Sequence, residues 1–199
     1  MMALKDFLVG LVLLASISTS KGGPCEEVEI VTRAEWNARP PTEVEYIDTA
    51  VNMSFVHHTA GTWECFDKDT CILMVQDIQN LHMDNNSWSD IGYSFLIGED
   101  GRVYEGRGWN VVGAHTYKYN SVAYGFCIIG NFMTRPPNDL ALNTAQKIID
   151  CGVQLGYTLP DYELFGHRDG SCTECPGDYL YAIIQTWSHY SFRTIPIYC

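Results

Sequence analysis

Short apolar runs alternate along this chain with segments in which apolar residues recur every three or four positions. The apolar runs are rich in β-branched residues and predict buried strands over 51–58, 123–129 and 164–166. Residues 94–97 and 103–105 flank Glu99-Asp100-Gly101-Arg102, and this arrangement predicts a hairpin with a glycine-containing turn.

Helical spacing occurs in three segments. Cys71 to Met83 follows Asp69-Thr70, a pair suited to capping a helix, and Leu140 to Val153 forms a second segment. A third helix is expected to begin at Gly177-Asp178. Strands interleaved with about three helices predict a single α/β domain, in which helices pack on a central mixed β-sheet.

The N-terminus has the pattern of a secretory signal peptide. A charged start is followed by an apolar stretch over 7–17 and by small residues up to Ser20. The stretch is too short to span a membrane, and no second apolar run of spanning length follows. We therefore expect residues 1–20 to be removed and residues 21–199 to form a secreted, extracellular domain.

Composition narrows the range of partners. The formal net charge is −12, whereas nucleic acids and anionic cell surfaces attract basic faces. We expect no nucleic-acid partner, and we expect recognition to reside in a groove. The sequence does not determine the oligomeric state; our expectation is a monomer.

Eight cysteines in a secreted chain predict disulfide bonds. Cys65 and Cys71 flank a short polar loop and form the simplest local pair. Cys25 and Cys151 would join the N-terminal segment to a helix. Cys127 lies within an apolar run and is expected to remain a buried free thiol.

Three residues could form a metal site. His57 ends one predicted strand, His167 follows another, and Cys175 comes after a short loop. Two imidazoles and one thiolate can hold zinc while leaving its fourth position open for water, as in hydrolytic sites. The alternative is that each histidine is an ordinary polar residue and that the cysteine is half of a disulfide.

Five ordered motifs carry a resemblance to a known family. They are Phe55-Val56-His57-His58-Thr59, Ile91 to Gly98, Gly101 to Asn110, Gly113-Ala114-His115 and Gly166-His167-Arg168-Asp169. From about Val31 to Tyr190 the chain resembles short secreted peptidoglycan recognition proteins, related to the phage lysozyme type of N-acetylmuramoyl-L-alanine amidase. Catalytic members of this innate-immunity family cleave the amide between N-acetylmuramic acid and L-alanine of the stem peptide, whereas members without the zinc cysteine only bind.

The resemblance implies roles for individual residues. His57, His167 and Cys175 would bind Zn²⁺, and Tyr93 and Thr173 would stabilise the oxyanion that forms during hydrolysis. His58 and Asp169 could support the metal-binding imidazoles, although a structural role is an equal alternative. The expected peptidoglycan-binding residues are Trp63, His82, Trp88, Gly108, Trp109, His115 and Tyr117. Gly108 and Trp109 match a pair associated with diaminopimelate-type stem peptides, while Trp36 and Trp187 are expected in the core.

Cys172 complicates the proposed metal site. It forms Cys172-Thr173-Glu174-Cys175, which could be a redox pair or half of a zinc ribbon, and a disulfide within it would remove the zinc thiolate. Cys199 has no other obvious partner. We therefore predict a Cys172–Cys199 disulfide that leaves Cys175 free.

Two functions remain open at this stage: a zinc amidase that degrades peptidoglycan, and a non-catalytic peptidoglycan-binding protein. Asn52 and Asn85 also begin glycosylation acceptor patterns. Asn52 lies in a predicted buried strand, which argues against its modification, whereas Asn85 is expected in a loop.

Overall fold

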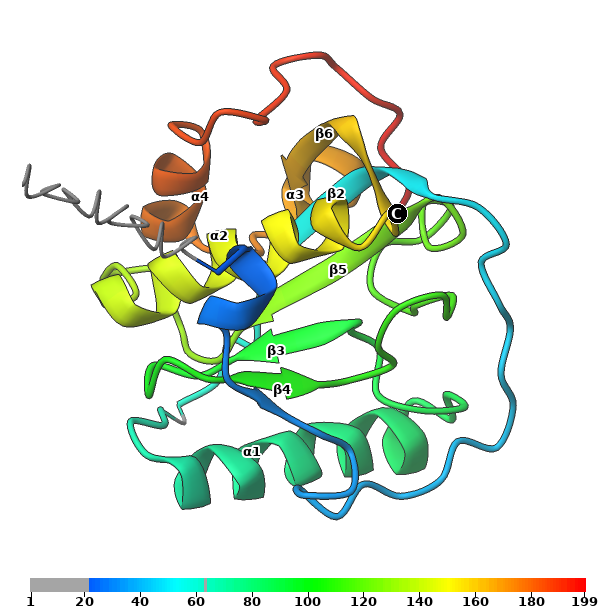
Figure 1. The fold of residues 1–199 in the computed structure, drawn as a ribbon, viewed down its shortest axis with the longest axis vertical. Coiled ribbons are helices and arrows are strands. Elements are labelled where there is room, and N and C mark those ends of the chain that lie inside the picture. Colours follow the sequence, from blue (N-terminus) through cyan, green and yellow to red (C-terminus); the bar gives the residue numbers. More distant parts are fainter. Residues whose placement is uncertain (1–21, 63) are drawn as a thin grey trace, which may run out of the picture.

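A six-stranded sheet organises the computed structural model, which describes residues 22–62 and 64–199. The strand order is β1-β4-β3-β5-β2-β6, and only β3 and β4 are antiparallel neighbours (Figure 1). The strands are β1 (Ile30–Val31), β2 (Val51–His58), β3 (Phe95–Ile97), β4 (Val103–Glu105), β5 (Ala123–Ile128) and β6 (Thr158–Gly166). The predicted mixed sheet of an α/β domain is confirmed.

Helices cover both faces of this sheet (Figure 1). The helices are α1 (Lys68–Asn80), α2 (Asp139–Gln154), α3 (His167–Gly170) and α4 (Asp178–Ile184), with the short turns η1 (Pro24–Glu27) and η2 (Leu81–Asn85). Helix α1 packs on one face, where Met74 and Val75 join the core cluster around Leu96 and Cys127. Helices α2 and α4 pack on the opposite face.

The alternation of side chains along the strands produces these two core clusters. In β5, Phe126 and Ile128 face α2, whereas Cys127 faces α1. Cys127 is fully buried and unpaired, and Trp36 is buried in the cluster beside α1, both as predicted. Trp187 is partly buried against the cluster beside α2.

Two elements begin earlier than predicted, because helix capping and strand pairing, rather than the spacing of apolar residues, set where they start. Helix α1 begins three residues earlier, because Asp67 rather than Asp69 is the cap and accepts a hydrogen bond from Thr70 N at 2.9 Å. Strand β6 begins at Thr158 rather than Leu164, because Thr158 already pairs with Val51 of β2; Pro160 lies in the unpaired stretch where the register shifts. The short elements η1, β1 and α3 were not predicted.

Three disulfides brace the fold, and all three predicted pairs are confirmed. They are Cys25–Cys151, Cys65–Cys71 and Cys172–Cys199. In the part of the chain that the structure describes, no helix is both long enough and apolar enough to cross a membrane. The proposed signal peptide and Trp63 lie outside the described residues.

The two glycosylation acceptor positions are both exposed. Asn52 is the one exposed residue of β2 and lies where the pairing register with β6 shifts, so the expectation that it would be buried is wrong. Asn85 ends η2 rather than lying in an irregular loop.

Candidate functional site

Three candidate ligands meet at the edge of the sheet where parallel strands end. Because β2 and β6 are parallel neighbours, their carboxyl ends lie side by side. His57 is the penultimate residue of β2, and His167 directly follows β6 as the first residue of α3. With Cys175 they offer ligand atoms that all lie within 4.8 Å of one another. The Cys175 Sγ is 3.8 Å from His57 Nδ1.

Backbone contacts hold Cys175 in this position. Its carbonyl accepts a hydrogen bond from Arg168 N at 2.9 Å, and its Sγ accepts one from His58 N at 3.4 Å. Cys172 is joined to Cys199, which leaves the Cys175 thiol unpaired. The structure therefore contains neither a redox pair nor a disulfide within the segment 172–175.

Burial determines the protonation of these groups. It lowers the pKa of His57 well below its ordinary value and that of His167 to about 4, so both imidazoles are neutral at pH 7 and have a lone pair for a metal. Burial also raises the pKa of Cys175 to about 12. A divalent cation would reverse that last effect, because coordination deprotonates a thiol. This donor set fits Zn²⁺.

The other nitrogen of His57 also has partners. His57 Nε2 lies 3.3 Å from His115 Nδ1 and 3.4 Å from Thr116 Oγ1, so the ring is oriented with Nδ1 toward Cys175. Gly125 allows this arrangement, because a Cβ there would lie 2.4 Å from His115 Cγ. Sequence reasoning missed Thr116, although it directly follows the Gly113-Ala114-His115 motif.

Tyr93 and Thr173 both line the pocket that contains Cys175. The Tyr93 ring centroid is 5.3 Å from that of His57. Burial, with smaller contributions from Cys127 and Cys175, raises the pKa of Tyr93 well above its usual value, so the phenol keeps its proton. Thr173 Oγ1 accepts a hydrogen bond from Cys175 N at 3.1 Å, which leaves its own hydroxyl hydrogen available to a ligand.

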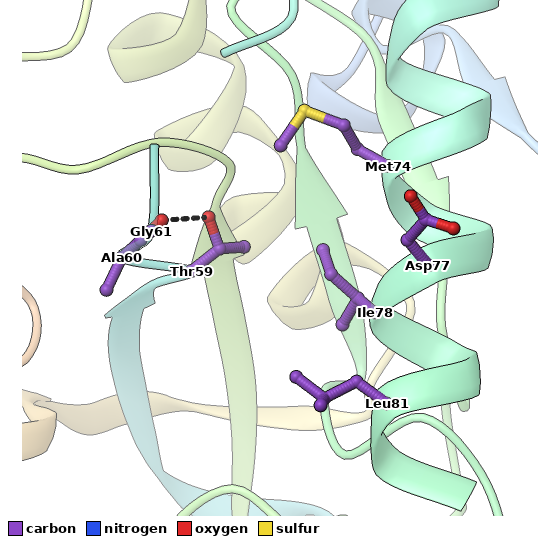
Figure 2. Close-up of a pocket in the computed structure, with 7 residues that line it drawn as sticks. All are labelled: Thr59, Ala60, Gly61, Met74, Asp77, Ile78 and Leu81. Carbon is purple, nitrogen blue, oxygen red and sulfur yellow. Dashed lines mark hydrogen bonds between the residues drawn. The ribbon is translucent and has the colours of Figure 1, made fainter. Parts of the chain in front are cut away.

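Two pockets meet at His167 and Thr173 and form a groove across the site. One, of about 430 Å³, contains Cys175 and is walled by Asn131 and Met133. The other, of about 420 Å³, lies on the side of His115. A third cleft, between α1 and the segment 59–61, shares Ala60 with the Cys175 pocket and extends the groove along the helix (Figure 2).

The structure places three of the seven predicted groove residues in one pocket. Trp88, His115 and Tyr117 line the 420 Å³ pocket. His82 is buried, with its ring 4.7 Å from Trp88 and 5.6 Å from Tyr93, and accepts a hydrogen bond from Gly92 N. It therefore lies behind the groove wall and supports the exposed ring of Trp88 and the ring of Tyr93.

Trp109 and Gly108 lie away from the groove. Trp109 packs in the core beside α2, where its ring stacks on Tyr157 at 5.3 Å and lies 4.4 Å from Phe95. Gly108 precedes it in a left-handed turn with φ of 72°. Neither residue lines the pockets next to the three ligands. The motif match placed Trp109 in the groove, whereas its large apolar ring is needed to fill the opposite face.

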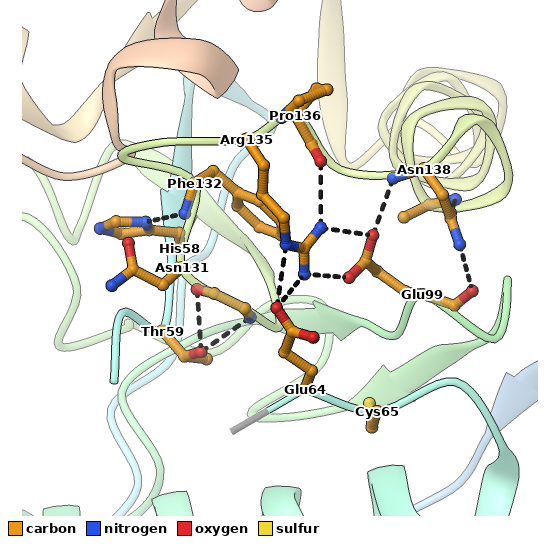
Figure 3. Close-up of polar contacts among 12 residues, drawn as sticks. His58, Thr59, Glu64, Cys65, Glu99, Asn131, Phe132, Arg135, Pro136 and Asn138 are labelled. Carbon is orange, nitrogen blue, oxygen red and sulfur yellow. Dashed lines mark hydrogen bonds and ion pairs between the residues drawn. The ribbon is translucent and has the colours of Figure 1, made fainter. Parts of the chain in front are cut away.

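His58 and Asp169 support the site through the backbone. His58 Nδ1 accepts a hydrogen bond from Phe132 N at 3.2 Å (Figure 3), and Asp169 accepts hydrogen bonds from Gly166 N and Tyr181 Oη. Asp169 therefore caps α3, the helix that presents His167.

An ion pair between Arg135 and the buried carboxylate of Glu99 fixes the loop that walls the Cys175 pocket. Arg135 forms hydrogen bonds with both carboxylate oxygens of Glu99 and also with Glu64 (Figure 3). Glu99 in turn accepts a hydrogen bond from Asn138 N at 2.8 Å. The loop between β5 and α2 is thus tied to the β3–β4 turn.

Known proteins resemble this chain in sequence and in fold. Residues 47–178 match the family described as N-acetylmuramoyl-L-alanine amidase. Mouse peptidoglycan recognition protein 3 is 44% identical over 81% of this chain, which spans 46% of that relative, and Bos indicus peptidoglycan recognition protein 1 is 43% identical over 90% of this chain and 93% of its own length.

This chain is also similar to a solved structure. Peptidoglycan recognition protein-LE, in complex with tracheal cytotoxin, a monomeric diaminopimelic acid-type peptidoglycan, is 39% identical. It superposes with a TM-score of 0.80 over 81% of this chain and 95% of its own. The chain belongs to the N-acetylmuramoyl-L-alanine amidase family and, within it, to the peptidoglycan recognition proteins.

Proposed function

We propose that this protein is a secreted, zinc-dependent N-acetylmuramoyl-L-alanine amidase. It binds bacterial peptidoglycan and hydrolyses the amide between N-acetylmuramic acid and L-alanine of the stem peptide, as part of innate immunity. The observation that carries the proposal is the convergence of His57, His167 and an unpaired Cys175, with ligand atoms within 4.8 Å of one another. A protein that only binds peptidoglycan would not need that thiol.

His57, His167 and Cys175 would hold the ion, which when bound polarises a carbonyl and activates water. Tyr93 remains a neutral phenol and can donate a hydrogen bond to the scissile carbonyl oxygen as negative charge develops there. The free hydroxyl hydrogen of Thr173 is available for the same oxygen.

The groove supports a polymeric substrate. Pockets open on both sides of His167, so a chain could lie across the site with one part on each side of the scissile bond. The complex of a relative with a diaminopimelic acid-type muropeptide supports the same substrate class. Three disulfides are consistent with secretion.

Matched histidine variants test the proposal. In zinc-loaded protein, His167→Gln and Cys175→Ser should each lower zinc content and abolish release of stem peptide from purified peptidoglycan. His189→Gln should preserve both, since that ring stacks on Tyr162, away from the three ligands.

The alternative is a non-catalytic binding protein. Tight binding of peptidoglycan without any release of stem peptide, by a preparation that holds one zinc per chain, would refute the amidase and leave only that alternative.

A further inference from the structure

The last ten residues of the chain return to the groove. They lie outside residues 47–178, the part that matches the amidase family. Ile195 is buried in a cluster with Phe55 and Phe165, and Tyr119 Oη donates a hydrogen bond to the Pro196 carbonyl at 2.6 Å. This segment is therefore packed on the sheet before it reaches the site.

Two further contacts attach its end beside the metal-binding helix. Tyr198 N donates a hydrogen bond to Gly170 O at 3.0 Å, and Ser171 and Tyr198 form a parallel β-bridge. Cys199 is bonded covalently to Cys172. Tyr198 is thereby attached to the same short segment, 167–175, that carries two of the three candidate ligands.

Tyr198 forms part of the groove wall. It lines the 420 Å³ pocket together with Trp88 and Tyr117, and its ring lies edge-on to that of Tyr117 with centroids 6.3 Å apart. Tyr117 is 62% exposed and Tyr198 37% exposed, so both rings have apolar surface that a ligand could cover.

The two pockets differ in chemistry. Among the described residues, no Asp, Glu, Lys or Arg lines the Tyr198 pocket, and aromatic rings make up much of its wall. The Cys175 pocket instead contains His58, Asn131 and Glu174, which suit the hydroxyl groups of a sugar. A stem peptide carries alanine methyl groups and the methylene chain of its diamino acid, which can pack on the aromatic rings of this pocket.

We propose that Tyr198 is a specificity-determining residue that packs on the stem peptide beyond its first residues, and that the Cys172–Cys199 bond holds it there. The inference rests on the proposed function and refines it. It assigns recognition of stem length to a segment outside the family-matched region.

Binding of muropeptides by the full chain after removal of zinc, a form that cannot hydrolyse them, tests this inference. Calorimetry would compare muramyl dipeptide with muramyl pentapeptide for wild type, Tyr198→Ala and Tyr198→Phe. Loss of one aromatic packing contact predicts about fivefold weaker pentapeptide binding by Tyr198→Ala, with dipeptide binding unchanged and Tyr198→Phe near wild type. Phe192→Ala is the matched control, because Phe192 belongs to the same segment and is 78% exposed, with its ring against Tyr190.

A double variant tests whether the Cys172–Cys199 disulfide holds Tyr198 in place. Replacing Cys172 and Cys199 together by serine should weaken pentapeptide binding to a similar degree, and adding Tyr198→Ala to that pair should cause little further loss. Equal weakening of both ligands by Tyr198→Ala, or no weakening of either, would overturn the inference. A wild-type protein that binds neither muropeptide would overturn the proposed function itself, and the inference with it.

Discussion

At the residue scale, the chemistry of the site was predictable from the sequence, but the partners of its residues were not. His57, His167 and Tyr93 could be identified because they lie within motifs, and Cys175 because it follows His167 after a short loop. Whether an aromatic side chain faces a groove or the core depends on which face of the sheet its loop approaches. No local pattern records that choice, and this is why the packing of Trp109 beside α2 could not be predicted.

Tyr93→Phe isolates one hydroxyl group. The variant should keep its zinc and its muropeptide affinity, because the ring and its contact with His57 remain. We expect kcat to fall about 100-fold if the phenol stabilises the oxyanion, as measured for the loss of one such donor in other hydrolases. Steady-state kinetics would check this, and an unchanged kcat would exclude that role.

Buried histidines predict a dependence of stability on pH in the metal-free protein. Burial lowers the pKa of His82 and His58 to about 4 and that of His115 to about 3. The unfolded chain therefore binds protons below about pH 6.5 that the folded chain excludes, and stability falls as the pH falls from 6.5 toward 4.

Thermal unfolding between pH 7 and pH 5, where most carboxylates stay ionised, measures this effect. The midpoint should fall by about 2–4 °C for each kcal/mol lost. His82→Gln should reduce the slope, and a flat profile in the wild type would contradict the assignment.

At the element scale, the sequence predicted the central strands and the longer helices because their periodicity is strong. Helix α3 and the first part of strand β6, residues 158–163, were missed because each depends on a neighbouring segment. Strand β6 is extended through pairing with β2, and α3 is one turn capped by Asp169. These two elements also position His167. The residues of the site were therefore easier to predict than their arrangement in space.

The Arg135–Glu99 pair should stabilise the loop between β5 and α2. The Glu99 side chain is 1% exposed, and Arg135→Met would leave its carboxylate with only backbone donors such as Asn138 N. We expect a loss of about 2–4 kcal/mol in the free energy of unfolding, measured in urea.

A surface ion pair provides the comparison for Arg135→Met. Arg39 and Asp84 are 43% and 56% exposed, so Arg39→Met should cost less than about 1 kcal/mol. Equal losses in the free energy of unfolding for the two arginine variants would show that burial of Glu99 does not strengthen its ion pair.

At the scale of the whole molecule, the disulfides differ in the length of chain that they close. Cys25–Cys151 has a sequence separation of 126, whereas Cys65–Cys71 has a separation of 6. Replacing each pair by serines should cost about 5 kcal/mol for the long loop and about 2 kcal/mol for the short one, if loss of unfolded-state entropy dominates. Denaturant unfolding of the two double variants would show whether this order holds.

The three candidate ligands come from segments that the sheet, the α3 cap and a crosslink already hold in place. Assembly of the metal site therefore does not have to be coupled to folding, as it is in small zinc domains that collapse without their ion. A chelator should yield an emptied protein that keeps its shape and is refilled by simple addition of zinc, so that the supply of metal would control the proposed amidase activity without consuming the protein.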